Sequence, residues 1–146
     1  WVVSYMTPAL EPDEMLLGLT LQPFGGTQNG QKQGHGFQEF ARRHGDYAIV
    51  AAATLLSLDA HHVITQAAIS LAGVDVKPCR LQAAEQALIG QKAEPAVFEQ
   101  IAQHARGLEM MEDAHISAAY RQRLAVTLIK RALTEAGTRA MGGQHG

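Results

Sequence analysis

The residue types that suggest binding chemistry gather in one stretch, Arg42 to Ala53. It begins with two arginines and a histidine, continues through Gly45, Asp46 and Tyr47, and ends in small apolar residues. This order predicts a loop that leads into a buried strand, with a bend at Gly45, where a positive φ costs little. An acid and an aromatic ring would stand at its tip, and loops fixed to a rigid element often carry binding residues. We therefore expect this corner to be the functional part of the chain.

Other residues with chemical potential are more weakly placed. The glycines from Gly25 to Gly36 match neither the P-loop nor the dinucleotide fingerprint, so we expect a mobile loop over residues 24–34. The seven histidines include no i, i+4 pair with a third ligand nearby, and we expect no metal site. Cys79 has no acid–base partner nearby in the sequence and is expected to be a buried or half-buried structural thiol.

The composition is that of an ordinary globular domain. The chain has 146 residues, 47% hydrophobic and 18% charged, with a net charge of −2. Dispersed charges of both signs give no electrostatic footprint for nucleic acid or an anionic membrane. One cysteine excludes an internal disulfide and a thiolate zinc site, and fits a reducing compartment. No apolar run approaches the roughly 20 residues that span a bilayer.

The hydrophobic pattern predicts four strands followed by helices. After an irregular lead-in over residues 1–13, whose first three residues could end an upstream strand, we expect strands at 15–21, 37–43, 47–58 and 63–73. A turn at 59–62 makes the last two strands an antiparallel pair. Because residues 47–58 are apolar on both faces, we expect a central strand covered on both sides.

Three helices should follow these strands. Residues 80–89 predict a short helix ended by Gly90, and residues 95–107 a second that begins at Pro95. The last helix should begin after Ser117 as its N-cap and fray over residues 141–146, which we expect to be disordered. We assign its core side to Tyr120, Leu124, Val126, Leu128, Ile129 and Leu133, and its polar side to Arg121, Arg123, Lys130 and Arg131. That polar side is expected to be solvated, with a subunit interface as the lesser alternative. The fold class is therefore α+β: an antiparallel sheet of three to four strands packed against about three helices.

Four motifs in this order resemble one known family. They are LEPDEML at 10–16, RRHGDYA at 42–48, PCR at 78–80 with AAE at 83–85, and HISAAYR at 115–121. Together they resemble the C-terminal domain of the FAD-binding medium subunit of molybdenum hydroxylases, the carbon monoxide dehydrogenase and xanthine dehydrogenase family. The chain departs from that family at Asp75 and Lys77, where glycine and threonine are frequent, and in its longer 24–34 loop.

The resemblance implies how the chain is organised. Residues 1–13 would lead in from a FAD-binding domain that lies upstream of Trp1, residues 14–140 would form the flavoprotein C-terminal domain, and residues 141–146 the tail. FAD would be bound mainly by the upstream domain. In the family, a large subunit carries the molybdenum cofactor, a small subunit carries two [2Fe–2S] clusters, and the subunits form a heterohexamer-type assembly in the cytoplasm. Partners would thus be proteins, without nucleic acid or membrane.

The resemblance also implies the roles of the corner residues. Electrons would pass from molybdenum through the clusters to FAD and then to an external acceptor, while this domain covers one side of the isoalloxazine ring. Tyr47 would stack on that ring, and Gly45, Asp46 and Arg43 would lie beside it as cofactor-binding residues. A fixed charge on Asp46 would disfavour the reduced anionic flavin, and Arg42 or Arg43 would oppose that effect or face another subunit.

Two other functions are weighed against this one. The chain can instead be a non-catalytic protein–protein interaction module with no redox role. A free-standing hydrolase or transferase has no nucleophile–base constellation behind it. We expect the domain to be part of an oxidoreductase and not catalytic by itself. The substrate and the electron acceptor do not follow from this sequence.

Overall fold

The computed structural model describes residues 2–4, 6–24 and 31–142. The main sheet is four-stranded and antiparallel, in the order β3 (Lys32–Phe40), β4 (Val50–Leu58), β5 (Ile64–Ala72) and β6 (Cys79–Arg80). The helices are α1 (Gln82–Leu88), α2 (Pro95–Ala102), the 3-10 helix η1 (Gln103–Gly107) and α3 (Ala118–Ala140). The predicted α+β class, with an antiparallel sheet and three helices, is confirmed. No helix in the described residues has the length and apolar character needed to cross a membrane.

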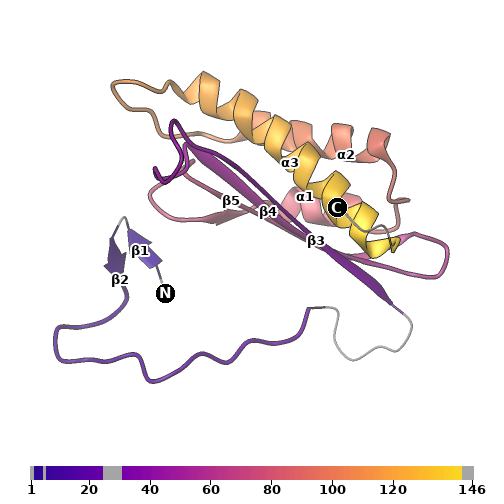
Figure 1. Ribbon diagram of the computed structural model, residues 1–146, viewed down its shortest axis with the longest axis horizontal. Coiled ribbons are helices and arrows are strands. Elements are labelled where there is room, and N and C mark those ends of the chain that lie inside the picture. The colour runs from indigo at the N-terminus through magenta and orange to yellow at the C-terminus, as the bar shows by residue number, and fades with distance from the viewer. Residues whose placement is uncertain (1, 5, 25–30, 143–146) are drawn as a thin grey trace.

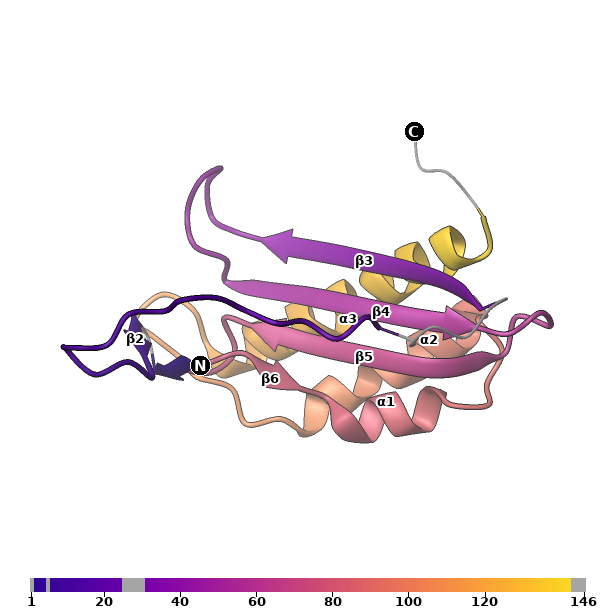
Figure 2. The same cartoon turned by 90° about the horizontal axis from the view of Figure 1, so that it is seen from below.

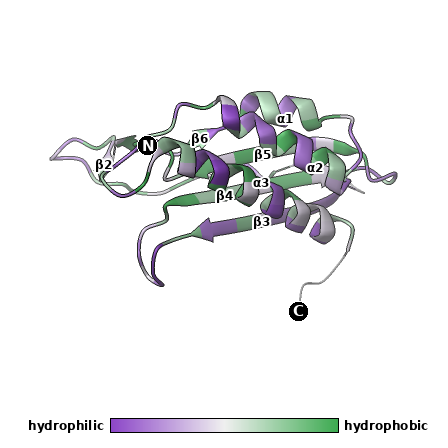
Figure 3. Cartoon of the chain, turned by 90° about the horizontal axis from the view of Figure 1, so that it is seen from above, coloured by the Kyte–Doolittle hydropathy of each residue, from purple (hydrophilic) through white to green (hydrophobic). Residues whose placement is uncertain are grey.

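The helices form a layer on one face of the sheet (Figure 1). The long helix α3 lies against β3 and β4, α1 packs on β5, and α2 packs on α3. The core between these layers takes its largest fully buried side chains from both, among them Leu56, Ile69, Leu88 and Leu133. In Figure 3 the central strands β4 and β5 are mostly green, that is hydrophobic, beneath the helices.

Glycines allow α3 to approach the sheet closely. Gly34 and Gly36 lie in β3 and face α3, where the helix presents Ala132 and Ala136. A Cβ on Gly36 would lie 2.0 Å from the carbonyl oxygen of Ala132, and one on Gly34 would lie 1.9 Å from that of Ala136. Backbone therefore packs on backbone at this contact, which a side chain on β3 would prevent.

The same observation corrects the predicted loop. The expected mobile loop over 24–34 ends earlier, because β3 begins at Lys32, and residues 25–30 lie outside the described residues. The predicted strand 37–43 consequently begins five residues too late, and the chain leaves the sheet after Phe40. Glycine disfavours strands in general, but here it is required by the helix that packs on it.

The predicted strand at 15–21 is wrong. Residues 15–21 are extended but pair with no strand in the described part of the chain, and Leu17, Leu19 and Leu21 are exposed. The predicted irregular lead-in is also corrected, because β1 (Val2–Ser4) and β2 (Thr7–Pro8) pair in an antiparallel manner with each other, and β1 is not the end of an upstream strand paired elsewhere in the described residues. Alternation alone does not make a strand, because a strand needs a hydrogen-bonding neighbour.

The prediction that the third strand is covered on both sides holds only in part. The strand begins at Val50, and α3 covers only the face that carries Val50, Ala52, Thr54, Leu56 and Leu58. On the opposite face, Ala51 and Ser57 are buried, whereas Ala53 is exposed and Leu55 is 38% exposed. The extended segment 9–24 runs on the side of the sheet away from the helices (Figure 2).

The remaining boundaries agree well with the sequence. The turn at 59–62 joins β4 to β5, where the Asp59 carboxylate accepts hydrogen bonds from the amides of His61 and Val63. The first helix begins two residues later than expected, because Cys79 and Arg80 form β6 beside β5. The second helix tightens into η1 after Ala102. The expected tail begins with Met141 and Gly142, and its residues 143–146 lie outside the described residues.

Candidate functional site

Three loops meet at one end of the sheet. The first is the Tyr47 corner, residues 41–49 between β3 and β4; the second is residues 73–78 between β5 and β6; the third is residues 108–117 between η1 and α3. They line two neighbouring pockets, which share Tyr47, Ala48 and Arg121. The antiparallel order of the sheet brings the first two loops together, since both connect strands at the same end.

The Tyr47 corner is a tight, internally bonded loop. The Asp46 amide donates to the Arg43 carbonyl (3.1 Å), and the Ile49 amide donates to the carbonyl of Phe40 (2.8 Å) at the base of the loop. Gly45 has a φ of 87°, as the predicted bend requires. The Arg43 and Asp46 side chains form an ion pair with an N–O distance of 3.5 Å. The loop thus turns sharply and presents Tyr47 at its end.

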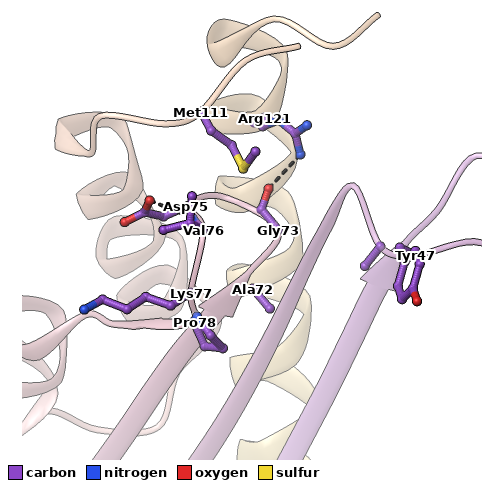
Figure 4. Close-up of a pocket in the computed structure, with 10 residues that line it drawn as sticks. Tyr47, Ala72, Gly73, Asp75, Val76, Lys77, Pro78, Met111 and Arg121 are labelled. Atoms are coloured by element: carbon purple, nitrogen blue, oxygen red, sulfur yellow. Dashed lines mark hydrogen bonds between the residues drawn. The ribbon is translucent and has the colours of Figure 1, made fainter. Parts of the chain in front are cut away.

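Tyr47 is the most exposed aromatic side chain in the described residues, with 82% of its surface accessible. An apolar pocket of about 390 Å³ lies on one side of it, lined by Ala72, Val76, Pro78 and Met111 among others. Figure 4 shows Tyr47 on one side of this pocket and the 75–78 loop on the other. A phenol ring held open at a pocket edge offers a flat apolar face with a polar tip.

The second pocket is larger and more polar, with a volume of about 590 Å³. Its lining includes Arg42, Arg43 and Asp46 from the corner, and His115 and Ile116 from the loop before α3. The four predicted site residues, Gly45, Asp46, Tyr47 and Arg43, therefore all lie on the wall of one pocket.

Arg121 connects the three loops from their buried side. Its guanidinium is buried in the first turn of α3, with the whole residue 5% exposed. Nη1 donates to the carbonyls of Ile49 (2.7 Å) and Gly73 (2.6 Å), and Nη2 donates to Oδ2 of Asp113 (2.6 Å). The prediction that Arg121 lies on the polar side of the last helix is wrong, whereas Arg123, Lys130 and Arg131 are exposed as expected.

Asp113 anchors the third loop. Its Oδ1 accepts hydrogen bonds from the amides of His115 (2.8 Å) and Ile116 (3.0 Å). The pKa of Asp113 is lowered, chiefly because the His115 amide donates to its carboxylate and also because Ile116 and Arg121 favour the charged form. The carboxylate is therefore ionised at neutral pH and balances the buried Arg121 cation.

Nucleophilic chemistry has little support at this site. Cys79 lies in β6, is half-buried, and has a thiol pKa raised by burial and by the nearby charge of Asp75. A raised pKa leaves the thiol protonated and weakly nucleophilic. In the described part of the chain, no three His, Cys, Asp or Glu side chains are grouped so that they could hold a metal ion. The geometry instead fits recognition of a flat partner at Tyr47.

Sequence reasoning missed Arg121, Asp113 and Met111. A signal for Arg121 existed: Ala125, Ile129 and Leu133 follow it at intervals of four and are all buried, so position 121 belongs to the core side of α3. The predicted core side held for Leu128, Ile129 and Leu133, whereas Tyr120, Leu124 and Val126 are only half-buried. On the core side of α3, small alanines that face β3 and β4 stand where the prediction put these three larger residues.

Comparison with known proteins shows the family to which the chain belongs. Residues 35–136 match the family model described as the CO dehydrogenase flavoprotein C-terminal domain. The chain is 32% identical over 140 residues to 6-hydroxypseudooxynicotine dehydrogenase complex subunit alpha of Paenarthrobacter nicotinovorans, covering 95% of this chain and 46% of that protein. It is 30% identical over 138 residues to the carbon monoxide dehydrogenase medium chain of Afipia carboxidovorans, with 94% and 46% covered.

A solved structure agrees with these sequence matches. Quinoline 2-oxidoreductase from Pseudomonas putida 86 superposes with a TM-score of 0.70 and 32% identity, over 75% of this chain and 38% of that one. The chain thus spans less than half the length of the relatives that it matches. Family model, curated relatives and fold agree with the resemblance that the four motifs indicated. The chain belongs to the CO dehydrogenase flavoprotein C-terminal domain family, from the medium subunits of molybdenum hydroxylases.

Proposed function

We propose that this domain covers one face of the flavin in the FAD-carrying medium subunit of a molybdenum hydroxylase and docks that subunit to its partners. The observation that carries the proposal is Tyr47: its ring is 82% exposed although its loop is tightly bonded and braced from the core. A large ring exposed on an ordered loop leaves apolar surface in contact with water. Covering that surface with a flat ligand is therefore favourable.

The residues of the corner fit one side of an isoalloxazine ring. Tyr47 offers the stacking face, while Gly45 lets the chain bend without a side chain at the tip. The Arg43–Asp46 pair places one charge of each sign beside the ring. FAD, held mainly by the upstream domain, would supply the redox chemistry, and this chain would orient the ring and shield it from water.

In the proposed assembly, the molybdenum cofactor of the large subunit would supply the oxidation of substrate. The [2Fe–2S] clusters of the small subunit and FAD would supply electron transfer to an external acceptor. We place the heterohexamer-type assembly in the cytoplasm, a proposal supported by the resemblance and by the use of a single cysteine. The domain itself contributes binding surface and no reacting group.

The Tyr47→Ala variant of the flavin-loaded assembly tests the proposal. Removing the stacked ring should shift the visible flavin absorption bands, raise flavin fluorescence, and change the rate at which an artificial acceptor reoxidises the flavin. Tyr47→Phe is the matched control, since it keeps the ring and should leave the absorption bands in place. Identical spectra and rates in Tyr47→Ala and the unmodified assembly would refute the role of Tyr47.

The interaction-module alternative rests on a separate observation. The sheet face opposite the helices carries exposed apolar side chains, with Phe37 at 56% and Leu55 at 38% exposure. Such a surface suits docking against another protein. The two functions are compatible, but a module with no redox role predicts that Tyr47→Ala leaves every flavin property unchanged.

A further inference from the structure

Arg121 is an unusual residue to find beneath a loop-built site. A guanidinium carries five donors, and burying it is costly unless carbonyls and carboxylates accept from them. Here two carbonyls and one carboxylate accept, while Nε is buried without a hydrogen-bond partner in the described residues. A protein that needed only a filled core would place an apolar side chain here, as α3 does one turn later at Ala125.

The acceptors of Arg121 come from three separate loops. The Ile49 carbonyl lies two residues after Tyr47, the Gly73 carbonyl opens the second loop, and Asp113 belongs to the third. One planar group therefore fixes the relative positions of the three segments that between them line the two pockets. In Figure 4 its hydrogen bond to Gly73 is drawn from the helix to the end of β5.

The contact between the first two loops is unusually close. Gly73 has a φ of 76°, and a Cβ there would lie 2.6 Å from the Ile49 carbonyl oxygen and 2.9 Å from that of Ala48. The Ile49 and Gly73 carbonyls both point at the same nitrogen of Arg121. Two carbonyl dipoles directed at one point repel each other, and a cation at that point removes the repulsion.

We propose that Arg121 is a positioning residue for the Tyr47 corner: its guanidinium holds the backbone of residues 48–49 against Gly73 and thereby sets the place of the Tyr47 ring over the flavin. The second half of this statement rests on the proposed function, and the first half does not. The arrangement needs arginine specifically, because a lysine ammonium is a point charge without the planar fork that reaches carbonyls and carboxylate together.

The test uses Arg121→Lys in the flavin-loaded assembly. The matched control is Arg123→Lys, which makes the same chemical change two residues along α3 at an exposed position. Hydrogen exchange is measured at the amides of Asp46, Ile49 and Met111, which donate to Arg43, Phe40 and Val74 within and between the loops. In Arg121→Lys these amides should exchange about tenfold faster, as expected for losing a charged hydrogen bond, and in Arg123→Lys they should not change.

The flavin spectrum separates positioning from a merely structural role. Arg121→Lys should shift the flavin bands in the same direction as Tyr47→Ala, whereas Arg123→Lys leaves them in place. Unchanged bands in Arg121→Lys, when Tyr47→Ala shifts them, would overturn the inference even if the melting temperature falls.

Failure of the proposed function gives a different result. If Tyr47→Ala itself leaves the bands unchanged, the proposed function fails, and the exchange rates alone decide whether Arg121 braces the corner. Should Arg121→Lys not assemble, Asp113→Asn weakens the same set of hydrogen bonds between Arg121 and the loops without removing the guanidinium. Faster exchange at Ile49 in that variant supports the inference, and an unchanged rate contradicts it.

Discussion

Adding one methyl group at Gly36 should separate the sheet from its longest helix. In Gly36→Ala the new Cβ would stand 2.0 Å from the Ala132 carbonyl oxygen and 2.8 Å from its carbonyl carbon. An ordinary contact of 3.4 Å requires β3 and α3 to part by about 1.4 Å at this point. The obstructing atoms are helix backbone, so no side-chain rotation can relieve the clash.

The expected cost follows from two opposing effects. Overpacking a well-filled interface costs about 1–3 kcal/mol, and a backbone obstruction belongs at the upper end of that range. Replacing glycine by alanine returns up to about 1 kcal/mol by restricting the unfolded chain. We therefore expect Gly36→Ala to lower the free energy of unfolding by about 2 kcal/mol, which for a chain of this length lowers Tm by about 6 °C.

Thermal unfolding of the purified chain, followed by far-UV circular dichroism, measures this change. Gly107→Ala is the control, because a Cβ there meets nothing within 4 Å. It should change stability by less than about 0.5 kcal/mol, as exposed substitutions usually do. If Gly36→Ala melts at the same temperature as Gly107→Ala, β3 and α3 do not meet through backbone, and the close-packed interface described above is wrong.

Two further predictions concern the start of α3 and the loop before it. Ser117→Ala removes the side-chain oxygen that accepts a hydrogen bond from the Tyr120 amide, and should lower the free energy of unfolding in urea by about 1 kcal/mol. Ser117→Asp keeps an acceptor and should lower it much less. Equal losses in the two variants would contradict the capping role. Asp113 has a lowered pKa in the folded chain, so its stabilising contribution is complete above the unfolded pKa of about 3.9 and is lost as pH falls through the lower folded value. Unfolding measured between pH 6 and pH 2 should show a shallower loss of stability below pH 4 in Asp113→Asn, and parallel curves would show that Asp113 does not contribute.

The local pattern predicted those elements whose partners lie nearby in the sequence. The β4–β5 hairpin and its turn followed from two apolar runs joined by four residues, and the N-cap at Ser117 followed from residue type. Gly45 was correctly placed at a positive φ because a charged loop had to bend into a buried strand. The family motifs at the corner and at the start of α3 were likewise readable from the sequence alone, and residues 35–136, which the family model matches, include both.

What the sequence left open depended on contacts between distant segments. Residues 15–21 alternate like a strand, but no neighbour in the described residues pairs with them. Gly36 is of a residue type typical of loops, but it packs against a segment of α3 that lies about 95 positions later in the chain. The sequence predicts a solvated cation at Arg121, whereas in the folded chain Ile49, Gly73 and Asp113 accept hydrogen bonds from its guanidinium. Residue types and spacing thus determined the β4–β5 hairpin, the three helices and the corner that carries Tyr47. Only the tertiary structure decided what braces that corner, because a charge can be buried only where folding brings its acceptors together.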